Sequence, residues 1–250
     1  FVITQLGADF KEETRYLPIA SISRENLDAL IGSPISAVVY EAVLTTDADG
    51  RVAPAQDLSQ AVPNRILTID EALHWMTGMA QAISPLHRDG IAHLDVKLAN
   101  FMLSTDTVKV TDFGLLRNLR APHSPVKSKG TLSYVAPEVS RRDENYHLAS
   151  DTWALGIIFA ELLIGRIDPS DPFGDVPCLV SQLSREPSLD KRKAAILGAF
   201  KEATQEHGAI QATRESPRFD KVLNCITALL DPSPQTRMNI VQLLEALSTI

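Results

Sequence analysis

The spacing of hydrophobic positions changes along this chain from a strand-like to a helix-like pattern. Residues 35–44 (ISAVVYEAVL) are apolar and rich in β-branched side chains, which predicts a buried strand running into a connector. From Leu73 to Leu86, apolar side chains recur at helical spacing. The pattern therefore predicts a small strand-containing start followed by a large helical bulk.

Other segments are identified by composition as well as by periodicity. Residues 9–17 (DFKEETRYL) are charged and indicate a helix, whereas residues 45–66 hold Asp-Gly, prolines and many polar residues. This second segment indicates a surface loop with one helical turn. Residues 101–111 contain two short apolar runs around a turn, which predicts a small β-hairpin, and residues 115–135 indicate a loop.

Two helices have recognisable start signals. Thr68 and Glu71 form a capping-box pattern at the beginning of the first helix. Ser150 is expected to cap a second helix, which runs through Leu163 and is apolar on nearly every face. We therefore expect this second helix to be buried and central, and the remaining sequence indicates further helices.

Charge and composition exclude some classes of function. The net charge is −7 and the isoelectric point is about 5.4, which argues against a nucleic-acid binder but allows a nucleotide ligand. The most apolar run, Trp153 to Gly165, is too short to span a bilayer, so no transmembrane segment is expected. Cys178 and Cys225 lack zinc-binding spacing and are expected to be buried free thiols, with one disulfide between them as the alternative, so the compartment is undecided.

Candidate chemistry is concentrated in an ordered series of short motifs. The series comprises residues 93–100 (HLDVKLAN), 112–114 (DFG), Gly130-Thr131, 136–138 (APE), 151–156 (DTWALG), and Arg237 near the end. In order and spacing, it resembles the eukaryotic-type protein kinases, whose signatures include a catalytic loop, DFG and APE. The resemblance covers roughly residues 10–250.

This resemblance implies an α+β, two-lobed protein-kinase-like fold with a reduced or truncated N-lobe and a complete helical C-lobe. Residues 1–250 would form a single domain, with a partial N-lobe and hinge at residues 1–43 and the C-lobe at residues 44–250. The nucleotide would lie between the two lobes.

The motif residues carry the roles that phosphoryl transfer requires. Asp95 is expected to be the carboxylate near the acceptor hydroxyl, and Lys97 the cation near the terminal phosphate. Asn100 and Asp112 are expected to bind Mg²⁺ through oxygen, the ligand atom that this hard ion prefers. Lys97, two residues after Asp95, and Thr131 match residues found at these positions in the serine/threonine-specific members of the family, so the resemblance implies that substrate class.

The resemblance also places nucleotide contacts in the first part of the chain. Glu13 matches the glutamate of the family's helix C. The predicted strand Ala37–Tyr40 leads into a hinge at Glu41, Ala42 and Val43, where backbone groups are expected to bind adenine.

Several other motif residues are expected to be structural. Glu138 and Arg237 should form a buried ion pair that ties the activation segment, Asp112 to Glu138, to the helical lobe. Asp151 should accept hydrogen bonds from the backbone near His93. His93 itself is expected to pack against Phe113 and Leu17 and to be neither a base nor a metal ligand.

Three features depart from the family pattern. The glycine-rich loop is absent from these residues, and Leu94 replaces the arginine before the catalytic aspartate. Thr4 stands where the ATP-pairing lysine is expected, which leaves three alternatives: the lysine strand precedes Phe1, residues are missing between this strand and Glu13, or the lysine is replaced. A kinase domain with an intact helical lobe and no glycine-rich loop resembles the apicomplexan secreted kinases that lack this loop and are related to rhoptry kinases. If that subgroup resemblance holds, the protein is secreted into a host-cell vacuole. Bacterial effector kinases with reduced N-lobes and an N-terminally truncated ordinary kinase are the alternatives.

The leading functional hypothesis is a serine/threonine protein kinase that uses ATP and Mg²⁺ to phosphorylate a protein substrate. The alternative is a pseudokinase that acts as a binding or scaffolding module for a protein partner. A small-molecule kinase of the aminoglycoside type shares the His-x-Asp spacing, but the APE motif together with Arg237 argues against it.

Overall fold

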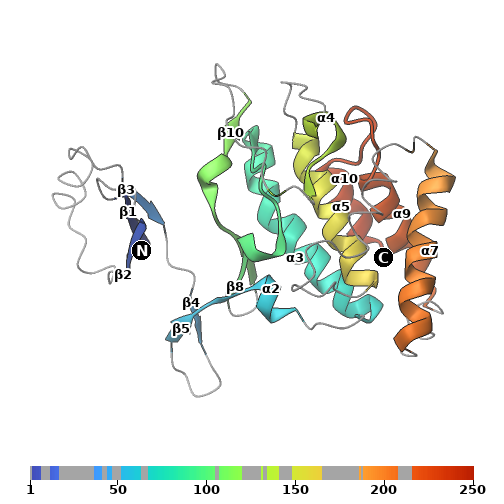
Figure 1. Ribbon diagram of the computed structural model, residues 1–250, viewed down its shortest axis with the longest axis horizontal. Coiled ribbons are helices and arrows are strands. Elements are labelled where there is room, and N and C mark those ends of the chain that lie inside the picture. Colours follow the sequence, from blue (N-terminus) through green and yellow to red (C-terminus); the bar gives the residue numbers. More distant parts are fainter. Residues whose placement is uncertain are drawn as a thin grey trace. The chain divides into compact units, whose positions relative to one another are not determined.

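In the computed structural model of this chain, strands precede helices in the order that the hydrophobic spacing predicts (Figure 1). The structure describes residues 2–6, 12–16, 37–40, 44–46, 52–62, 67–104, 107–119, 131, 134–140, 148–164, 186, 188–207 and 216–250. The chain divides into two units, Phe1–Ala55 and Gln56–Ile250. The predicted α+β class, with a small sheet near the N-terminus and a helical C-terminal part, is confirmed.

The first unit is built from short antiparallel strands. Strand β1 (Val2–Leu6) pairs with both β2 (Glu12–Tyr16) and β3 (Ala37–Tyr40), so the strand order is β2-β1-β3. Strands β4 (Leu44–Thr46) and β5 (Val52–Pro54) form a separate hairpin. The strand expected at residues 37–40 is confirmed, and the hinge residues Glu41 and Val43 lie outside the described residues.

The helix predicted at residues 9–17 is wrong. Residues 12–16 form strand β2, in which Glu13 lies opposite Gln5 of β1. Thr14 and Tyr16 favour strands, and pairing with β1 satisfies their backbone groups, so the cross-strand partner outweighs the helix-like charge pattern. The comparison of Glu13 with a helix-C glutamate therefore loses its structural basis, and its role in nucleotide binding stays a prediction.

The second unit begins with a turn and a long helix that both agree with the sequence. Strand β6 (Gln56–Asp57) is followed by α2 (Leu58–Ala61), the single helical turn expected within residues 45–66. Strands β4, β5 and β6 show that the rest of this segment is not simply a loop. Helix α3 (Ile69–Arg88) has the predicted capping box, in which Thr68 and Glu71 each bond the other's backbone.

The remaining elements alternate short strands and turns before the helical bulk. They are β7 (Ile91–Ala92), η2 (Leu98–Asn100), β8 (Phe101–Ser104), β9 (Thr107–Val110), η3 (Phe113–Leu115), β10 (Arg117–Asn118), α4 (Pro137–Ser140), α5 (Leu148–Ile164), α7 (Leu189–His207), α9 (Phe219–Leu229) and α10 (Ile240–Ser248). Strands β8 and β9 are the predicted hairpin, with β6 at its edge, and β7 pairs with β10. The loop expected at residues 115–135 thus contains one short strand.

Helix α5 is the buried centre of the second unit, as predicted. It packs against α3, α7 and α9, and Trp153, Leu155 and Phe159 are fully buried. A Cβ atom at Gly156 would lie 2.9 Å from side-chain atoms of Leu229 and Leu230, so glycine permits this close approach of α5 and α9. No helix in the described ranges is both long and apolar enough to cross a membrane.

The capping role predicted for Ser150 is wrong. Helix α5 begins earlier, at Leu148, and the Ser150 hydroxyl donates a hydrogen bond to Glu138 at 3.1 Å. A buried carboxylate from another segment therefore takes the place of the local backbone partner that a cap would use. Cys225 is a buried free thiol as predicted, and burial raises its pKa, whereas Cys178 lies outside the described residues.

Candidate active site

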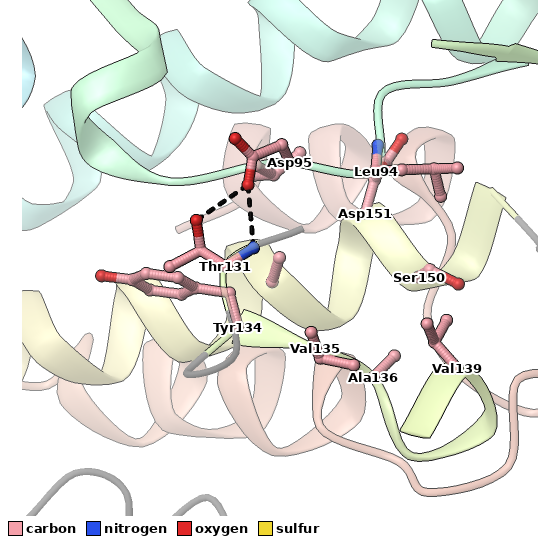
Figure 2. A pocket seen from close by; sticks show the side chains of 11 residues that line it. Leu94, Asp95, Thr131, Tyr134, Val135, Ala136, Val139, Ser150 and Asp151 are labelled. Carbon is pink, nitrogen blue, oxygen red and sulfur yellow. Dashed lines mark hydrogen bonds between the residues drawn. The ribbon is translucent and has the colours of Figure 1, made fainter. Parts of the chain in front are cut away.

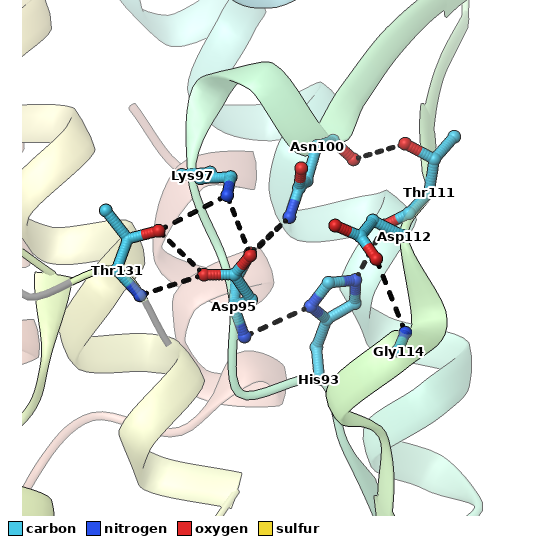
Figure 3. A network of polar contacts seen from close by, with 8 residues as sticks. All are labelled: His93, Asp95, Lys97, Asn100, Thr111, Asp112, Gly114 and Thr131. Atoms are coloured by element: carbon cyan, nitrogen blue, oxygen red, sulfur yellow. Dashed lines mark hydrogen bonds and ion pairs between the residues drawn. The ribbon is translucent and has the colours of Figure 1, made fainter. Parts of the chain in front are cut away.

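The Asp95 carboxylate is the hub of a polar network in the loop between β7 and η2 (Figure 3). One oxygen accepts hydrogen bonds from Lys97 Nζ at 2.8 Å and Asn100 Nδ2 at 3.0 Å. The other accepts from the Thr131 backbone N at 3.0 Å and from Thr131 Oγ1 at 2.9 Å. The structure thus brings together three of the residues singled out in the sequence around one carboxylate.

These donors keep Asp95 ionised. Burial by itself would raise the pKa of Asp95, because the charged form loses water. Hydrogen bonds from Lys97 and Thr131, together with the positive charge of Lys97, outweigh burial and hold the pKa below its ordinary value of 3.8. The side chain of Asp95 is only 10% exposed. It is therefore a carboxylate, able to accept a proton, at neutral pH.

Asn100 and Asp112 are brought to the same end of the β8–β9 hairpin. The Thr111 backbone N donates to the Asn100 carbonyl at 2.8 Å, and the Thr111 hydroxyl donates to the same oxygen at 3.2 Å. Asp112 follows directly, with a left-handed backbone (φ 60°), and its carboxylate accepts from the Gly114 N at 3.4 Å. A non-glycine residue in this conformation is strained, and such strain is frequent at functional sites.

The donor set fits a divalent metal that shares its ligands with another molecule. The Asn100 side-chain nitrogen, Nδ2, donates to Asp95, so the side-chain oxygen Oδ1 is the atom left to bind a metal. With the Asp112 carboxylate, it makes an oxygen pair suited to Mg²⁺. No group of three or more His, Cys, Asp or Glu side chains that could hold a metal occurs among the described residues. A metal here would therefore complete its shell with phosphate oxygens and water.

His93 links the Asp95 loop to the segment that carries Asp112. Its Nε2–H donates to the Thr111 carbonyl at 2.9 Å, and its Nδ1 accepts the Asp95 backbone N–H at 3.3 Å. These two partners assign the tautomer with hydrogen on Nε2. The ring is buried and meets Phe113 edge-on at a centroid distance of 5.9 Å, which confirms the predicted contact with Phe113, whereas Leu17 lies outside the described residues.

Asp151, in the first turn of α5, accepts hydrogen bonds from the backbone of the same loop. One oxygen accepts the His93 backbone N–H at 2.7 Å, and the other accepts that of Leu94 at 2.8 Å, as predicted. Leu94 has a left-handed backbone with φ 65°. Since Leu94 directly precedes Asp95, these hydrogen bonds help to determine how the Asp95 carboxylate is aimed.

The predicted ion pair between Glu138 and Arg237 is present and buried. The two guanidinium nitrogens donate to the two carboxylate oxygens at 2.8 and 2.9 Å. The guanidinium also donates to the Ala149 and Asp231 carbonyls and lies 5.1 Å from the Trp153 ring centre. This cluster anchors the first turn of α4 through Glu138, which lies seven positions after Thr131, a residue that contacts Asp95.

A pocket opens directly beside the network (Figure 2). Figure 2 shows Leu94 and Asp95 facing a second wall formed by Tyr134, Val135 and Ala136. The complete lining is Leu94, Asp95, Val96, Thr131, Tyr134, Val135, Ala136, Val139, Ser150, Asp151 and Ala154. Six of the eleven lining residues are apolar, and the other five carry carboxylate or hydroxyl groups, among them Asp95.

The sequence missed one residue next to this site, and the predicted nucleotide contacts of the first unit stay predictions. His87 lies with its Nε2 2.9 Å from an Asp151 oxygen, and both side chains are buried. A histidine in the last turn of a helix is equally typical of a dipole-stabilising cation, so the sequence carried no distinguishing signal. Glu13 belongs to the first unit, and Glu41 and Val43 lie outside the described residues.

Comparison with known proteins supports the motif analysis. A family model described as "Protein kinase domain" matches residues 51–247, well over half of the chain. The chain is 39% identical over 99 residues to serine/threonine-protein kinase PLK4 of Xenopus laevis, which covers 39% of this chain and 10% of PLK4.

Longer alignments occur with a second group of kinases. The chain is 30% identical over 167 residues to mitogen-activated protein kinase kinase kinase 13-A of Xenopus laevis, and 29% identical to the human kinase 13 over the same length. These alignments cover 66% of this chain and 16% of each relative. The chain therefore spans only a small part of the length of the curated relatives that it matches.

Proposed function

Because the chain belongs to the protein kinase domain family, we propose that it is a serine/threonine protein kinase, which transfers the γ-phosphate of ATP to protein hydroxyls. The observation that carries this proposal is the Asp95 carboxylate, held ionised by Lys97 and Thr131 and also hydrogen-bonded by Asn100. This arrangement supplies an acceptor for the substrate's proton and a cation within 2.8 Å of it.

The geometry indicates how Asp95 meets an acceptor hydroxyl. Its two oxygens already receive four donors, so an incoming hydroxyl must displace one of them. Lys97 is the donor best able to move, because its side chain is flexible and 28% exposed. As it turns towards the transferred phosphoryl group, Asp95 accepts the hydroxyl proton in its place.

ATP with Mg²⁺ supplies the phosphoryl group and the positive charge that offsets its developing negative charge. Asn100 and Asp112 would hold the metal through their oxygens. Thr131 fixes the activation segment to Asp95 and so orients a peptide laid across that segment. The names of the relatives and the Lys97–Thr131 contact of 3.2 Å support serine and threonine, rather than tyrosine, as acceptors.

A pseudokinase is the second candidate function. It is favoured by Thr4, which lies on β1 where an ATP-pairing lysine is expected, and by Glu13, which lies on a strand instead of a helix. In that case the fold would bind a protein partner without catalysis. The likeness to apicomplexan secreted kinases, drawn from the absent glycine loop, stays a prediction.

The test compares wild type with Asp95→Asn in a radiolabelled phosphotransfer assay with ATP, Mg²⁺ and a serine/threonine peptide library. We expect Asp95→Asn to lower kcat by roughly 10²-fold or more, the usual contribution of a general base. Asp89→Asn is the matched control, because it makes the same change at an exposed residue.

Thermal melting with and without ATP and Mg²⁺ separates the two candidate functions. A ligand that binds the folded state raises Tm by mass action. Equal residual phosphorylation by wild type and Asp95→Asn would contradict the kinase proposal. If Mg²⁺ and ATP together still raise Tm in that case, the result favours a nucleotide-binding pseudokinase.

A further inference from the structure

Gly78 lies in the interior of α3, and the proposed reaction gives it no role. Glycine is a poor helix former, because its backbone has the most freedom to lose on folding. The neighbouring strand β9 explains its place: a Cβ atom at Gly78 would lie 2.7 Å from Cγ2 of Val108 and 3.3 Å from its Cβ. The missing side chain therefore lets β9 lie closer to α3 than any other residue would allow.

Turning the valine side chain cannot relieve this contact. Carbon atoms in ordinary contact are about 3.5–4.0 Å apart, so a methyl group at Gly78 would have to push Val108 away by roughly 1 Å. Rotation of Val108 about its Cα–Cβ bond moves Cγ2 but leaves Cβ in place, so the 3.3 Å contact stays. A β-branched side chain also has few rotamers to choose from. Either the helix or the strand must therefore shift.

The strand is the element that can move. Helix α3 packs against α5 and α10 as well as against β9, and Met76 and Met79, which flank Gly78 in sequence, are fully buried. Strand β9 is an outer strand of the sheet β6-β8-β9, and its residues Thr107 and Lys109 are exposed. A larger residue at position 78 would therefore lift β9 away from α3.

Lifting β9 would separate the two residues that are proposed to hold the metal. Asp112 follows the end of β9, whereas Asn100 is fixed by its Nδ2, which donates to the carbonyl and the carboxylate of Asp95 at 2.8 and 3.0 Å. Phe101, at the start of β8, is fully buried. Thr111 joins the two sides, because its N–H and its hydroxyl donate to the Asn100 carbonyl at 2.8 and 3.2 Å (Figure 3). A shift of β9 would thus move Asp112 relative to Asn100.

We propose that Gly78 is a positioning residue for the divalent metal. By letting β9 lie against α3, it sets how far the side-chain oxygens of Asn100 and Asp112 are from each other. Mg²⁺ demands near-ideal octahedral geometry, so its affinity depends strongly on that separation. The metal part of this inference rests on the kinase function proposed above. The position of β9 does not, and it can be measured without nucleotide.

Metal binding is tested by titrating Mg²⁺ into the whole chain with a non-hydrolysable ATP analogue. We expect Gly78→Ala to raise the Mg²⁺ concentration at half-maximal binding about tenfold, as changes in residues that orient metal ligands do. Affinity for the analogue without Mg²⁺ should change less than about twofold, since that binding does not use the metal ligands. Gly198→Ala is the matched control: a Cβ atom at this position in α7 would meet no atom within 4 Å, so the Mg²⁺ requirement should not change.

Val108 offers a rescue that a merely structural role of Gly78 would not predict. Val108→Ala removes Cγ2 and leaves only the 3.3 Å contact, so Gly78→Ala/Val108→Ala should recover most of the lost Mg²⁺ affinity. Val108→Ala alone should bind Mg²⁺ as the wild type does. If Gly78→Ala does not fold, Val108→Ile crowds the same contact from the strand and takes its place in the titration.

Amide hydrogen exchange at Thr111 reports the position of β9 without any ligand. The Thr111 N–H donates to the Asn100 carbonyl at 2.8 Å. We expect its exchange to be about tenfold faster or more in Gly78→Ala, because β9 no longer holds this donor in place. Protection should return in Gly78→Ala/Val108→Ala and should be unchanged in Gly198→Ala.

The proposal is wrong if Gly78→Ala needs no more Mg²⁺ than Gly198→Ala. It is also wrong if the double variant needs as much Mg²⁺ as Gly78→Ala, because the contact with Val108 would then not be the cause. Faster exchange at Thr111 with an unchanged Mg²⁺ requirement would refute the link from β9 to the metal. A wild type that binds no analogue with Mg²⁺ would instead refute the proposed kinase function, and the exchange measurement would then decide whether Gly78 holds β9 in place.

Discussion

Replacing Glu138 with alanine tests whether the buried ion pair anchors the activation segment. The substitution removes both carboxylate oxygens that the Arg237 guanidinium contacts, at 2.8 and 2.9 Å. The Arg237 side chain is 0% exposed, so water cannot replace them. Breaking one side of such a pair typically costs about 3–5 kcal/mol.

The remaining partners of Arg237 place the expected cost at the low end of that range. Two carbonyl oxygens still accept from the guanidinium, at 2.7 Å from Ala149 and 2.8 Å from Asp231, and the Trp153 ring lies 5.1 Å away. We therefore expect a loss of about 3 kcal/mol in the free energy of unfolding. For a chain of this size, such a loss lowers Tm by roughly 6–12 °C.

The assay is thermal and urea unfolding followed by tryptophan fluorescence, with Trp153 as a reporter next to Arg237. The double variant Glu138→Leu/Arg237→Met should recover most of the stability, because no charge is left buried. Lys191→Ala is the surface control, since its contact with Glu186 is 3.8 Å long and the lysine is 74% exposed. The reasoning fails if Glu138→Ala is no less stable than Lys191→Ala, or if the double variant is as unstable as the single one.

Two further predictions concern the charge around Asp95. Leu94, the residue before Asp95, is uncharged and cannot pair with a phosphate, so replacing Ser124, Ser128 and Ser133 together with alanine should change kcat less than about threefold. A tenfold or larger loss of kcat, about 1.4 kcal/mol, in both this variant and phosphatase-treated wild type would show that phosphates on these serines are needed for activity. Lys97→Met should raise the pKa of Asp95, because burial raises that pKa and the Lys97 hydrogen bond and charge are among the contributions that lower it. Since the folded-state pKa lies below the ordinary 3.8, the stabilisation from ionised Asp95 is present above that value and is lost as pH falls through the folded-state pKa. An NMR titration of the Asp95 carboxyl carbon that is unchanged by Lys97→Met would contradict this cause.

Most of the candidate site was accessible from the sequence, because its residues lie close together along the chain. Asp95, Lys97 and Asn100 lie within six consecutive positions, and the hairpin returns the chain to Asp112 beside Asn100. Local signals also predicted the capping box at Thr68. These features depend on neighbours within a few residues, and the rules of periodicity and capping describe such neighbours well.

The wrong and missing assignments share a physical cause. The charged segment at residues 9–17 resembles a helix until β1 pairs with it, and Ser150 resembles a cap until Glu138 accepts its hydroxyl. His87 has no recognisable signal at all, because its partner lies 64 residues away. In each case a distant segment supplies the partner, and its contribution exceeds the local preference.

The sequence by itself determined the kinase motifs, the passage from a strand-containing start to a helical bulk, and the apolar faces of the helices that became α3 and α5. Only the tertiary structure decided which donors surround Asp95, which residue of the loop has a strained backbone, and which groups hold that backbone in place. The bonds from Asp151 to His93 and from Arg237 to Glu138 join residues 58 and 99 positions apart. Hydrophobic periodicity places a side chain on a face of its own helix, but the chain must fold before that face acquires a partner.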